Sequence, residues 1–403
     1  MLVYLINIFL IIVWALIFCT GKRTRLKKWL FVGICFAQLY LISAYRYRIG
    51  ADYSQYAVGF FHMSIDGFSN LQYEDWEIGY VLLNKIIGIS TAQPATFIMI
   101  SSLFPLIGPA YLIGKYSVNP FMSVFLYVNL YLFYLDLNYI RQAIAMSIIC
   151  FAFGFLRDKK FWRFLLIVAI AACFHLTVLY MIPVFFVGML KVNTRTMLLY
   201  LFGLLFYYIL SDGLLNIILS SFHEEYSGSI YIENGVYFFY SFFPLMLCAG
   251  MVALAYFVKD KSRTLELLIH LTLMMGFWQI VMTKHALFER FSYYTMLFVI
   301  LAVPEALRAF KKQLTMNLTE RYANDYHVKS KDQEDYRIAA RKAEGKSILI
   351  VTLVTLGVIV LAFAYNMMGL IVPENGVHGV LPYQMQNGYE LPSIDHWFKG
   401  SNN

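Results

Sequence analysis

Long apolar stretches alternate with short charged runs along almost the whole chain. Twelve of these stretches match membrane segments in length and hydropathy, near residues 1–20, 29–45, 95–114, 119–136, 140–157, 161–174, 176–190, 196–212, 238–258, 264–282, 290–307 and 347–371. Two of them, 161–174 and 176–190, are shorter than the roughly 20 residues that a helix needs to cross a bilayer, so we expect partial helices there. The pattern predicts an all-α, polytopic integral membrane protein with about twelve membrane segments, including short or partial helices.

The apolar stretch 76–90 is the exception to this count. Treating it as a full crossing would invert the orientation of every later segment. We therefore expect it to be re-entrant or to lie at the outer surface of the membrane.

Composition supports the same class. Of the 403 residues, 60% are hydrophobic and only 14% are charged, with a mean hydropathy of +0.63. Soluble domains carry about 25% charged residues, which excludes an ordinary soluble fold. The five cysteines lie inside apolar stretches without paired spacing, so we interpret them as core residues and not as disulfides or metal ligands.

The distribution of basic residues predicts the orientation. The first apolar stretch lacks a basic leader and is followed by Lys22, Arg23, Arg25, Lys27 and Lys28, which indicates a retained span with its N-terminus outside. This orientation places 25 of the 32 Lys and Arg residues on the cytoplasmic side, as the positive-inside rule requires. The net charge of +8 thus reflects topology, and we expect no nucleic-acid partner.

The same topology predicts the domain organisation. Residues 1–371 are expected to form a single transmembrane helical domain, and residues 372–403 a non-cytoplasmic tail. The domain should carry outer loops at 46–94 and 213–237, and a mixed-charge cytoplasmic loop at 308–346, which we interpret as a solvated, partly helical connector.

Four arginines are predicted to face the outer side, where the positive-inside rule should deplete them. They are Arg46, Arg48, Arg141 and Arg290. Each could merely extend to lipid phosphate, as interfacial cations do. Several together favour a substrate role, because ionisable groups at membrane depth are costly. Arginine binds phosphate oxygens bidentately, so the set fits a pyrophosphate at headgroup depth.

Carboxylates and tyrosines accompany these arginines. Asp52 and Glu77, with Tyr53 and Tyr56, lie in the first outer loop and suit the sugars of a lipid-linked glycan. Tyr293, which follows Arg290, is a further candidate for binding sugar. The alternative for the aromatic residues is a belt at the membrane interface.

Motifs of other enzyme classes are missing from the sequence. It contains no Walker motif, no glycine-rich phosphate loop, no His/Cys metal spacing and no Gly-x-Ser-x-Gly elbow. We therefore expect neither a metal nor a cofactor.

Five short motifs together resemble those of the EpsG family. In chain order they are Arg48-Ile49-Gly50-Ala51-Asp52-Tyr53 with Tyr56, Glu77-Ile78-Gly79-Tyr80 with Leu83, Arg141-Gln142-Ala143-Ile144-Ala145, His175-Leu176-Thr177, and Arg290-Phe291-Ser292-Tyr293-Tyr294. The resemblance runs from about residue 30 to 310. The charged segment after Arg308 and the tail after Ile371 depart from it.

The resemblance implies a Wzy-type polymerase of exopolysaccharide, capsule or O-antigen with a GT-C-like fold. Such an enzyme would work at the outer face of the bacterial cytoplasmic (inner) membrane. It would move a growing glycan from undecaprenyl pyrophosphate onto a lipid-linked repeat unit, so its partners would be that lipid-linked oligosaccharide and the bilayer. A chain-length regulator and a flippase of the same pathway are further partners that it implies.

The implied reaction also needs a general base for the acceptor hydroxyl. Asp52, Glu77 and His175 are the candidates. We favour His175, because an imidazole with an ordinary pKa near 6.5 suits that role. A histidine in an apolar stretch can also be a hydrogen-bonded core residue, and the sequence does not separate the two.

Two other function classes stay open at this point. A flippase for the same lipid would also carry outward arginines, although it needs a polar path through the bilayer and mid-span charges are nearly absent here. Transporters often contain internal repeats, and none is visible. An O-antigen-ligase-like glycosyltransferase or an outward-facing acyltransferase is the closer alternative.

Overall fold

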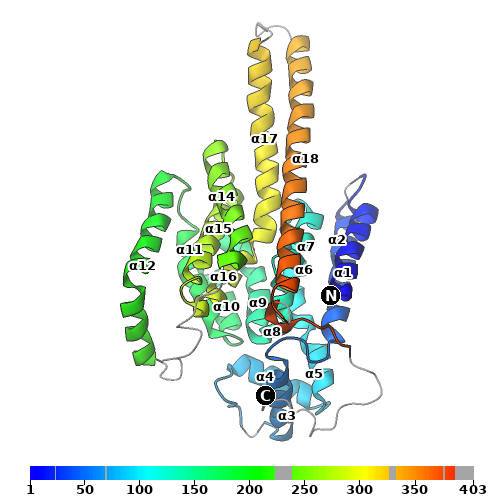
Figure 1. The fold of residues 1–403 in the computed structure, drawn as a ribbon, viewed down its shortest axis with the longest axis vertical. Helices are drawn as coiled ribbons and strands as arrows, with labels where there is room; N and C mark the ends of the chain where they lie inside the picture. The colour runs from blue at the N-terminus through cyan, green and yellow to red at the C-terminus, as the bar shows by residue number, and fades with distance from the viewer. Residues whose placement is uncertain (23, 69, 223–237, 326–332, 375–376, 386–403) are drawn as a thin grey trace. The chain divides into compact units, whose positions relative to one another are not determined.

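The computed structural model describes residues 1–403 except 23, 69, 223–237, 326–332, 375–376 and 386–403. Its described part is helical, with two isolated β-bridges (Figure 1). The α-helices are α1 Leu2–Phe18, α2 Arg25–Ala44, α3 Tyr53–Ile65, α4 Ile78–Gly88, α5 Pro94–Ser101, α6 Leu103–Tyr116, α7 Pro120–Asn129, α8 Leu132–Asn138, α9 Ile140–Arg157, α10 Phe161–Ala172, α11 Met181–Val187, α12 Thr194–Phe222, α14 Phe242–Phe257, α15 Arg263–Val281, α16 Glu289–Met296, α17 Val299–Asp325 and α18 Gln333–Ile371. Short 3₁₀ helices are η1 Leu176–Tyr180, η3 Phe238–Ser241, η4 Ala286–Phe288 and η5 Val377–Gly379.

Fewer helices qualify as membrane spans than the sequence predicts. Within the described residues, six helices are long and apolar enough to cross a membrane, or eight if two bent pairs each form one span. The bent pairs are α7 with α8, at 50°, and the segment Ala286–Met296 with α17, at 51°. The all-helical membrane class is therefore confirmed. The predicted number of about twelve membrane segments is not confirmed, because only six to eight of them are candidate full-length spans among the described residues.

Three of the other four predicted segments form short helices, namely α1, α10 and the pair η1–α11. The fourth, predicted at 196–212, lies within the longer helix α12, which has 29 residues. The stretch 76–90 forms α4, whose 11 residues extend only about 16 Å at 1.5 Å per residue. That length is about half of a bilayer core, so α4 does not cross it in one pass.

Apolar side chains on the outside explain how such helices suit a bilayer. In α18, Leu349, Leu353 and Val360 are each at least 60% exposed, and in α12 Leu201 and Phe202 are exposed by more than 60%. Surfaces of this kind are unfavourable in water and favourable against lipid chains.

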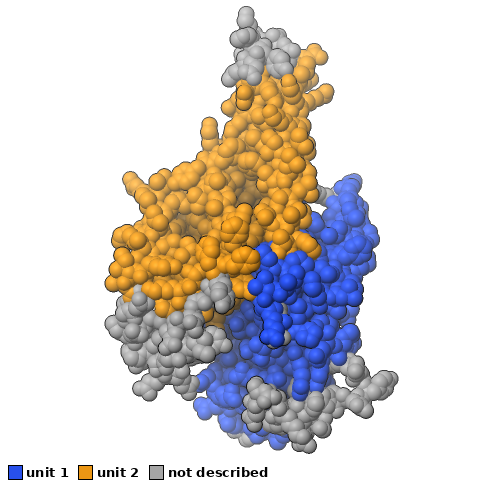
Figure 2. Space-filling model, in the orientation of Figure 1, with its two compact units in different colours: residues 1–186, 365–403 blue, residues 187–364 orange. Residues whose placement is uncertain are grey.

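The chain divides into two compact units (Figure 2). The first unit comprises residues 1–186 and 365–403, and the second comprises residues 187–364. Helix α18 belongs to the second unit up to Ala364 and to the first from Tyr365. The prediction of a single domain over 1–371, with its loops placed on given sides of a membrane, stays a prediction.

The core of the first unit is built on α7, α8 and α9. Gly108 of α6 lets this helix approach α9 closely, because a Cβ there would lie 1.9 Å from the carbonyl oxygen of Ser147. The Ser147 hydroxyl in turn accepts a hydrogen bond from the Gly108 amide at 2.8 Å. In the same core, the buried carboxylate of Asp136 accepts a hydrogen bond from Tyr127.

The described part of the C-terminal tail packs against the start of the predicted outer loop 46–94. The amide of Gly50 donates to the carbonyl of Gly379 at 3.0 Å, and the amide of Tyr47 donates to that of Gln384 at 3.0 Å. Gly50 has a φ of +98°, and a Cβ there would lie 2.5 Å from the carbonyl oxygen of Leu137, so the turn requires glycine.

The second unit contains α12 and α14 to α17 with most of α18. Its buried His270 bonds the Tyr200 hydroxyl at 3.0 Å. The described residues of the charged segment 308–346 lie in α17 and α18, where the hydroxyls of Thr315 and Ser347 join the two helices at 2.7 Å. Most of the predicted outer loop 213–237, and the tail beyond residue 385, lie outside the described residues.

Candidate functional site

An aromatic cluster supports one end of the first unit. Tyr56 and Phe60 of α3 pack with Trp76, Tyr80 of α4 and residues of α5 and α9. The edge of the Trp76 ring packs against α3 at Gly59, where a Cβ would come within 2.4 Å of it. This packing fixes the position of the residue that follows Trp76 in the chain.

Glu77 holds three segments of the first unit together. It sits at the N-cap position of α4 but does not cap that helix. Instead, Oε1 lies 2.9 Å from Nδ1 of His175 and accepts the Leu176 amide at 3.1 Å. Its other oxygen, Oε2, forms an ion pair with Nη1 of Arg141 at 2.8 Å. Residues that are 64 and 98 positions from Glu77 in the sequence therefore meet on one carboxylate.

Arg141 is placed by the first turn of α9. Its guanidinium lies over the Trp76 ring at 5.4 Å, a cation–π distance, and is also within hydrogen-bonding reach of Tyr56. Its Nε is buried and has no hydrogen-bond partner among the described residues. The contact with Glu77 thus uses only part of the five donors of the guanidinium.

The charges around Glu77 keep it ionised. Burial by itself raises the pKa of this carboxyl, but the hydrogen bond from His175, with the positive charges of His175 and Arg141, outweighs burial and lowers the pKa from 4.5 to about 2. A carboxylate with so low a pKa is a weak base at neutral pH. Because the Glu77 carboxylate is so weak a base, the imidazole of His175 is the better candidate for proton transfer in this cluster.

A close backbone contact sets the position of His175. The Gly79 amide donates to the carbonyl of Cys173 at 2.7 Å, and a Cβ on Gly79 would lie 2.7 Å from the same oxygen. Glycine is therefore required where α4 begins beside the turn that precedes η1. His175 itself has an extended backbone and directly precedes η1, as its N-cap residue.

Arg46 and Arg48 occupy different environments from Arg141. Arg46 is completely buried, and its Nη1 donates to Ser102 Oγ at 2.6 Å and to Ser43 Oγ at 3.0 Å. Arg48 is exposed, has a φ of +51°, and lies over the Tyr47 ring at 5.6 Å. The protein encloses the first guanidinium and leaves the second accessible.

Asp52 and the neighbouring tyrosines lie at the start of α3. The Asp52 amide donates to Oδ1 of Asn138 at 3.0 Å, which ties this helix to the end of α8. Tyr53 and Tyr56 are buried, with 1% and 4% of their surface exposed. Burial also raises the pKa of Tyr56, against the opposing influence of Arg141. Both tyrosines contact protein in this structure, and a contact with sugar stays a prediction.

Arg290 and Tyr293 belong to α16 in the second unit. Tyr293 is buried and donates a hydrogen bond to Glu289. Arg290 is half-buried and follows Glu289 directly. Whether these residues face the same substrate as Glu77, Arg141 and His175 stays a prediction.

Three residues contribute to the cluster in roles that the sequence did not assign. The Trp76 ring packs against the Arg141 guanidinium, and Gly79 allows the Cys173 carbonyl to approach closely. The Asn138 side chain accepts a hydrogen bond from the Asp52 amide. The signal for Gly79 was its place inside a motif, since a glycine at a helix start often marks close backbone approach. Trp76 and Asn138 had no such signal, because their roles depend on partners far away in the sequence.

One of three comparisons with known proteins identifies the family. Residues 28–318 match the model of the EpsG family, which covers well over half of the chain. No curated protein and no solved structure matches the chain. The chain belongs to the EpsG family, a Wzy-type polymerase family, and this membership indicates a role in polysaccharide polymerisation.

Proposed function

We propose that this member of the EpsG family is a GT-C-like, metal-independent glycosyltransferase of the bacterial cytoplasmic membrane. It transfers a growing glycan from undecaprenyl pyrophosphate onto the non-reducing end of a lipid-linked repeat unit at the outer face. The observation that carries this proposal is that Glu77 contacts both Arg141 and His175. It forms an ion pair with Arg141 and a hydrogen bond with His175.

In the proposed reaction, His175 acts as the general base. Glu77 holds Nδ1 of the imidazole at 2.9 Å, which orients the ring and stabilises its protonated form. Nε2 takes the proton from the acceptor hydroxyl, and the resulting oxygen attacks the anomeric carbon of the growing glycan. The bond from that carbon to the pyrophosphate oxygen breaks, and the leaving group departs with the electron pair.

Arg141 stabilises the departing pyrophosphate. The ion pair with Glu77 and the Trp76 ring fix one side of the guanidinium, so its remaining donors are oriented before the substrate binds. Preorganised donors aimed at developing charge are usually the largest catalytic contribution. Arg48 and Arg290 are proposed to bind further phosphate oxygens, whereas Arg46 is proposed to stabilise the corner between α2 and α3.

The test is reconstitution of the full chain into vesicles with lipid-linked repeat units, read as a ladder of polymer lengths. His175→Asn retains an amide that can contact Glu77 but lacks the second ring nitrogen, so we expect chain extension to fall by about a hundred- to ten-thousandfold. His62→Asn, on the exposed part of α3, is the matched control and should extend normally. Wild-type ladders from His175→Asn would exclude the imidazole as the base.

A further inference from the structure

A cavity lies at the opposite end of the first unit from Glu77. It has a volume of about 880 Å³ and is formed by the end of α1, the start of α2, the end of α6 and the start of α7. Helix α2 runs from this cavity to the corner at Arg46, and its 20 residues span about 30 Å. The cavity and the corner at Arg46 are therefore separated by roughly the thickness of a bilayer core.

Among the described residues, three cations line this cavity and no carboxylate does. They are Arg25 and Lys28, on one face of α2, and Lys115 at the end of α6. The sequence from Met1 to Ala51 contains no Asp or Glu, and neither does the stretch from Ile78 to Leu135. Like charges around one cavity repel one another unless an anion lies between them.

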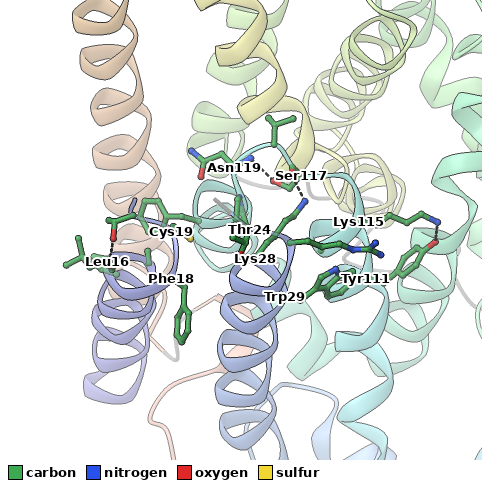
Figure 3. A pocket seen from close by; sticks show the side chains of 18 residues that line it. Leu16, Phe18, Cys19, Thr24, Lys28, Trp29, Tyr111, Lys115, Ser117 and Asn119 are labelled. Atoms are coloured by element: carbon green, nitrogen blue, oxygen red, sulfur yellow. Dashed lines mark hydrogen bonds between the residues drawn. The ribbon is translucent and has the colours of Figure 1, made fainter. Parts of the chain in front are cut away.

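The ammonium of Lys28 is held in place. Figure 3 shows its side chain reaching from α2 toward Ser117, and its Nζ donates to the Ser117 carbonyl at 2.6 Å. Beside it, the Asn119 amide donates to the Ser117 hydroxyl at 3.1 Å, which fixes the loop before α7. An ammonium has three donors, so this anchor leaves others for an anion.

Apolar side chains complete the lining. Ile12 and Leu16 of α1 line the cavity and are also exposed on the outside of the unit, by 39% and 63%. The Trp29 ring packs on α6 at Gly114, where a Cβ would come within 2.3 Å of it. A wall that continues into an apolar outer surface suits a ligand with both an anionic head and a hydrocarbon tail.

We propose that this cavity binds the phosphate headgroup of an anionic phospholipid, whose acyl chains lie along α1. Basic pockets between membrane helices on the cytoplasmic side bind such headgroups through lysine and arginine. The predicted topology places the cavity on that side, because Lys22 to Lys28 follow the first span. The proposal does not depend on the polymerase reaction or on the residues that carry it.

The test uses the full chain purified in an uncharged detergent and titrated with phosphatidylglycerol or phosphatidylcholine. Bound lipid is counted by native mass spectrometry, and the unfolding temperature is measured in parallel. We expect phosphatidylglycerol to bind at least about tenfold more tightly than phosphatidylcholine, with a preference that weakens at high salt. Equal binding of the two lipids would overturn the proposal.

A matched pair of variants separates the cavity from general basic charge. Arg25→Gln, Lys28→Gln and Lys115→Gln together should remove the preference for phosphatidylglycerol. A control triple variant removes the same number of cations outside the cavity, through Lys22→Gln, Lys27→Gln and Lys191→Gln. It should retain the preference for phosphatidylglycerol. If both triple variants lose the preference to the same extent, the cavity is not the site.

Two further experiments test whether the cavity itself is needed and whether its ligand is a lipid or a soluble phosphate. Val118→Phe narrows the cavity without a change in charge and should weaken the binding of phosphatidylglycerol, provided that the variant elutes as wild type in size-exclusion chromatography. Single Lys28→Gln serves if the triple variant does not fold. Inorganic phosphate and pyrophosphate, added at millimolar concentration, should not displace the lipid. Full displacement would assign the cavity to a soluble phosphate compound and would overturn the lipid proposal.

Discussion

The two ends of the first unit use cations in opposite ways. At the end with α3 and α4, Arg141 is paired with the ionised carboxylate of Glu77 and stacked on an aromatic ring. At the other end, Arg25, Lys28 and Lys115 line a cavity that has no carboxylate among its described lining residues. A cation that is compensated inside the protein is fixed in geometry, which is what catalysis requires. An uncompensated set instead attracts an external anion.

Labelling of introduced cysteines gives the largest expected effect. Each cysteine either reacts with an impermeant reagent added outside the cell or does not, so the outcome is all or none. Cysteines placed at Lys22 and at Asp66 report the two ends, and both positions are exposed. On intact cells, an impermeant maleimide should label the cysteine at 66 and leave the one at 22 unlabelled until the membrane is opened. A cysteine at Lys342, in the charged segment, should behave like the one at 22. The reverse pattern would overturn the N-out topology and the side assigned to each site.

Substitution of Arg141 by lysine tests the compensated end. Lysine keeps the charge but cannot keep the planar fork, so chain extension should fall by about a hundred- to thousandfold, or about 2.7–4 kcal/mol. Arg157→Lys is a matched control, since Arg157 ends the same helix and pairs with Asp158 at 2.8 Å on the surface. We expect Arg290→Lys to resemble Arg141→Lys. Normal polymer from Arg141→Lys would leave that arginine with a structural role only.

Gly79→Ala tests whether the backbone contact positions His175. The new Cβ would meet the Cys173 carbonyl at 2.7 Å, so the strain should cost about 1–3 kcal/mol and lower the unfolding temperature. Gly33 of α2 has no atom within 4 Å of an added Cβ, and Gly33→Ala should be neutral or stabilising by up to about 1 kcal/mol. Equal unfolding temperatures for the two variants would show that the segment around Cys173 moves freely.

Acid titration gives the smallest expected effect. Because the pKa of folded Glu77 is about 2, below the ordinary 4.5, its ionised form stabilises the fold above pH 4.5, and this stabilisation is lost as the pH falls toward 2. The Glu77→Gln variant should unfold a few degrees below the wild type at pH 7, and this difference should shrink by about half on going to pH 3. The measurement is the unfolding temperature from pH 7 to pH 3. A constant difference over that range would mean that the charge of Glu77 does not stabilise the fold.

Hydrophobic periodicity was enough to place the helices but not to decide their length. All twelve predicted segments are helical, yet three of them are shorter than a membrane span, and α7–α8 is bent where the sequence predicts one continuous helix. The bend lies at Tyr131, which has a φ of +64° and whose hydroxyl donates to the carbonyl of Tyr365. A break of this kind depends on a partner 234 residues away, which local pattern does not reveal.

The sequence by itself determined the membrane class, the family and the identity of the residues that carry charge on the predicted outer side. These properties follow from composition and from short motifs, which need no knowledge of contacts. Only the tertiary structure decided that Glu77 binds both Arg141 and His175, while Arg46, similar in sequence context, is enclosed by serines. Burial and pairing depend on which segments meet. The structure therefore favours an anchoring role for the Glu77 carboxylate, because the fold brings the guanidinium of Arg141 and the imidazole of His175 to it.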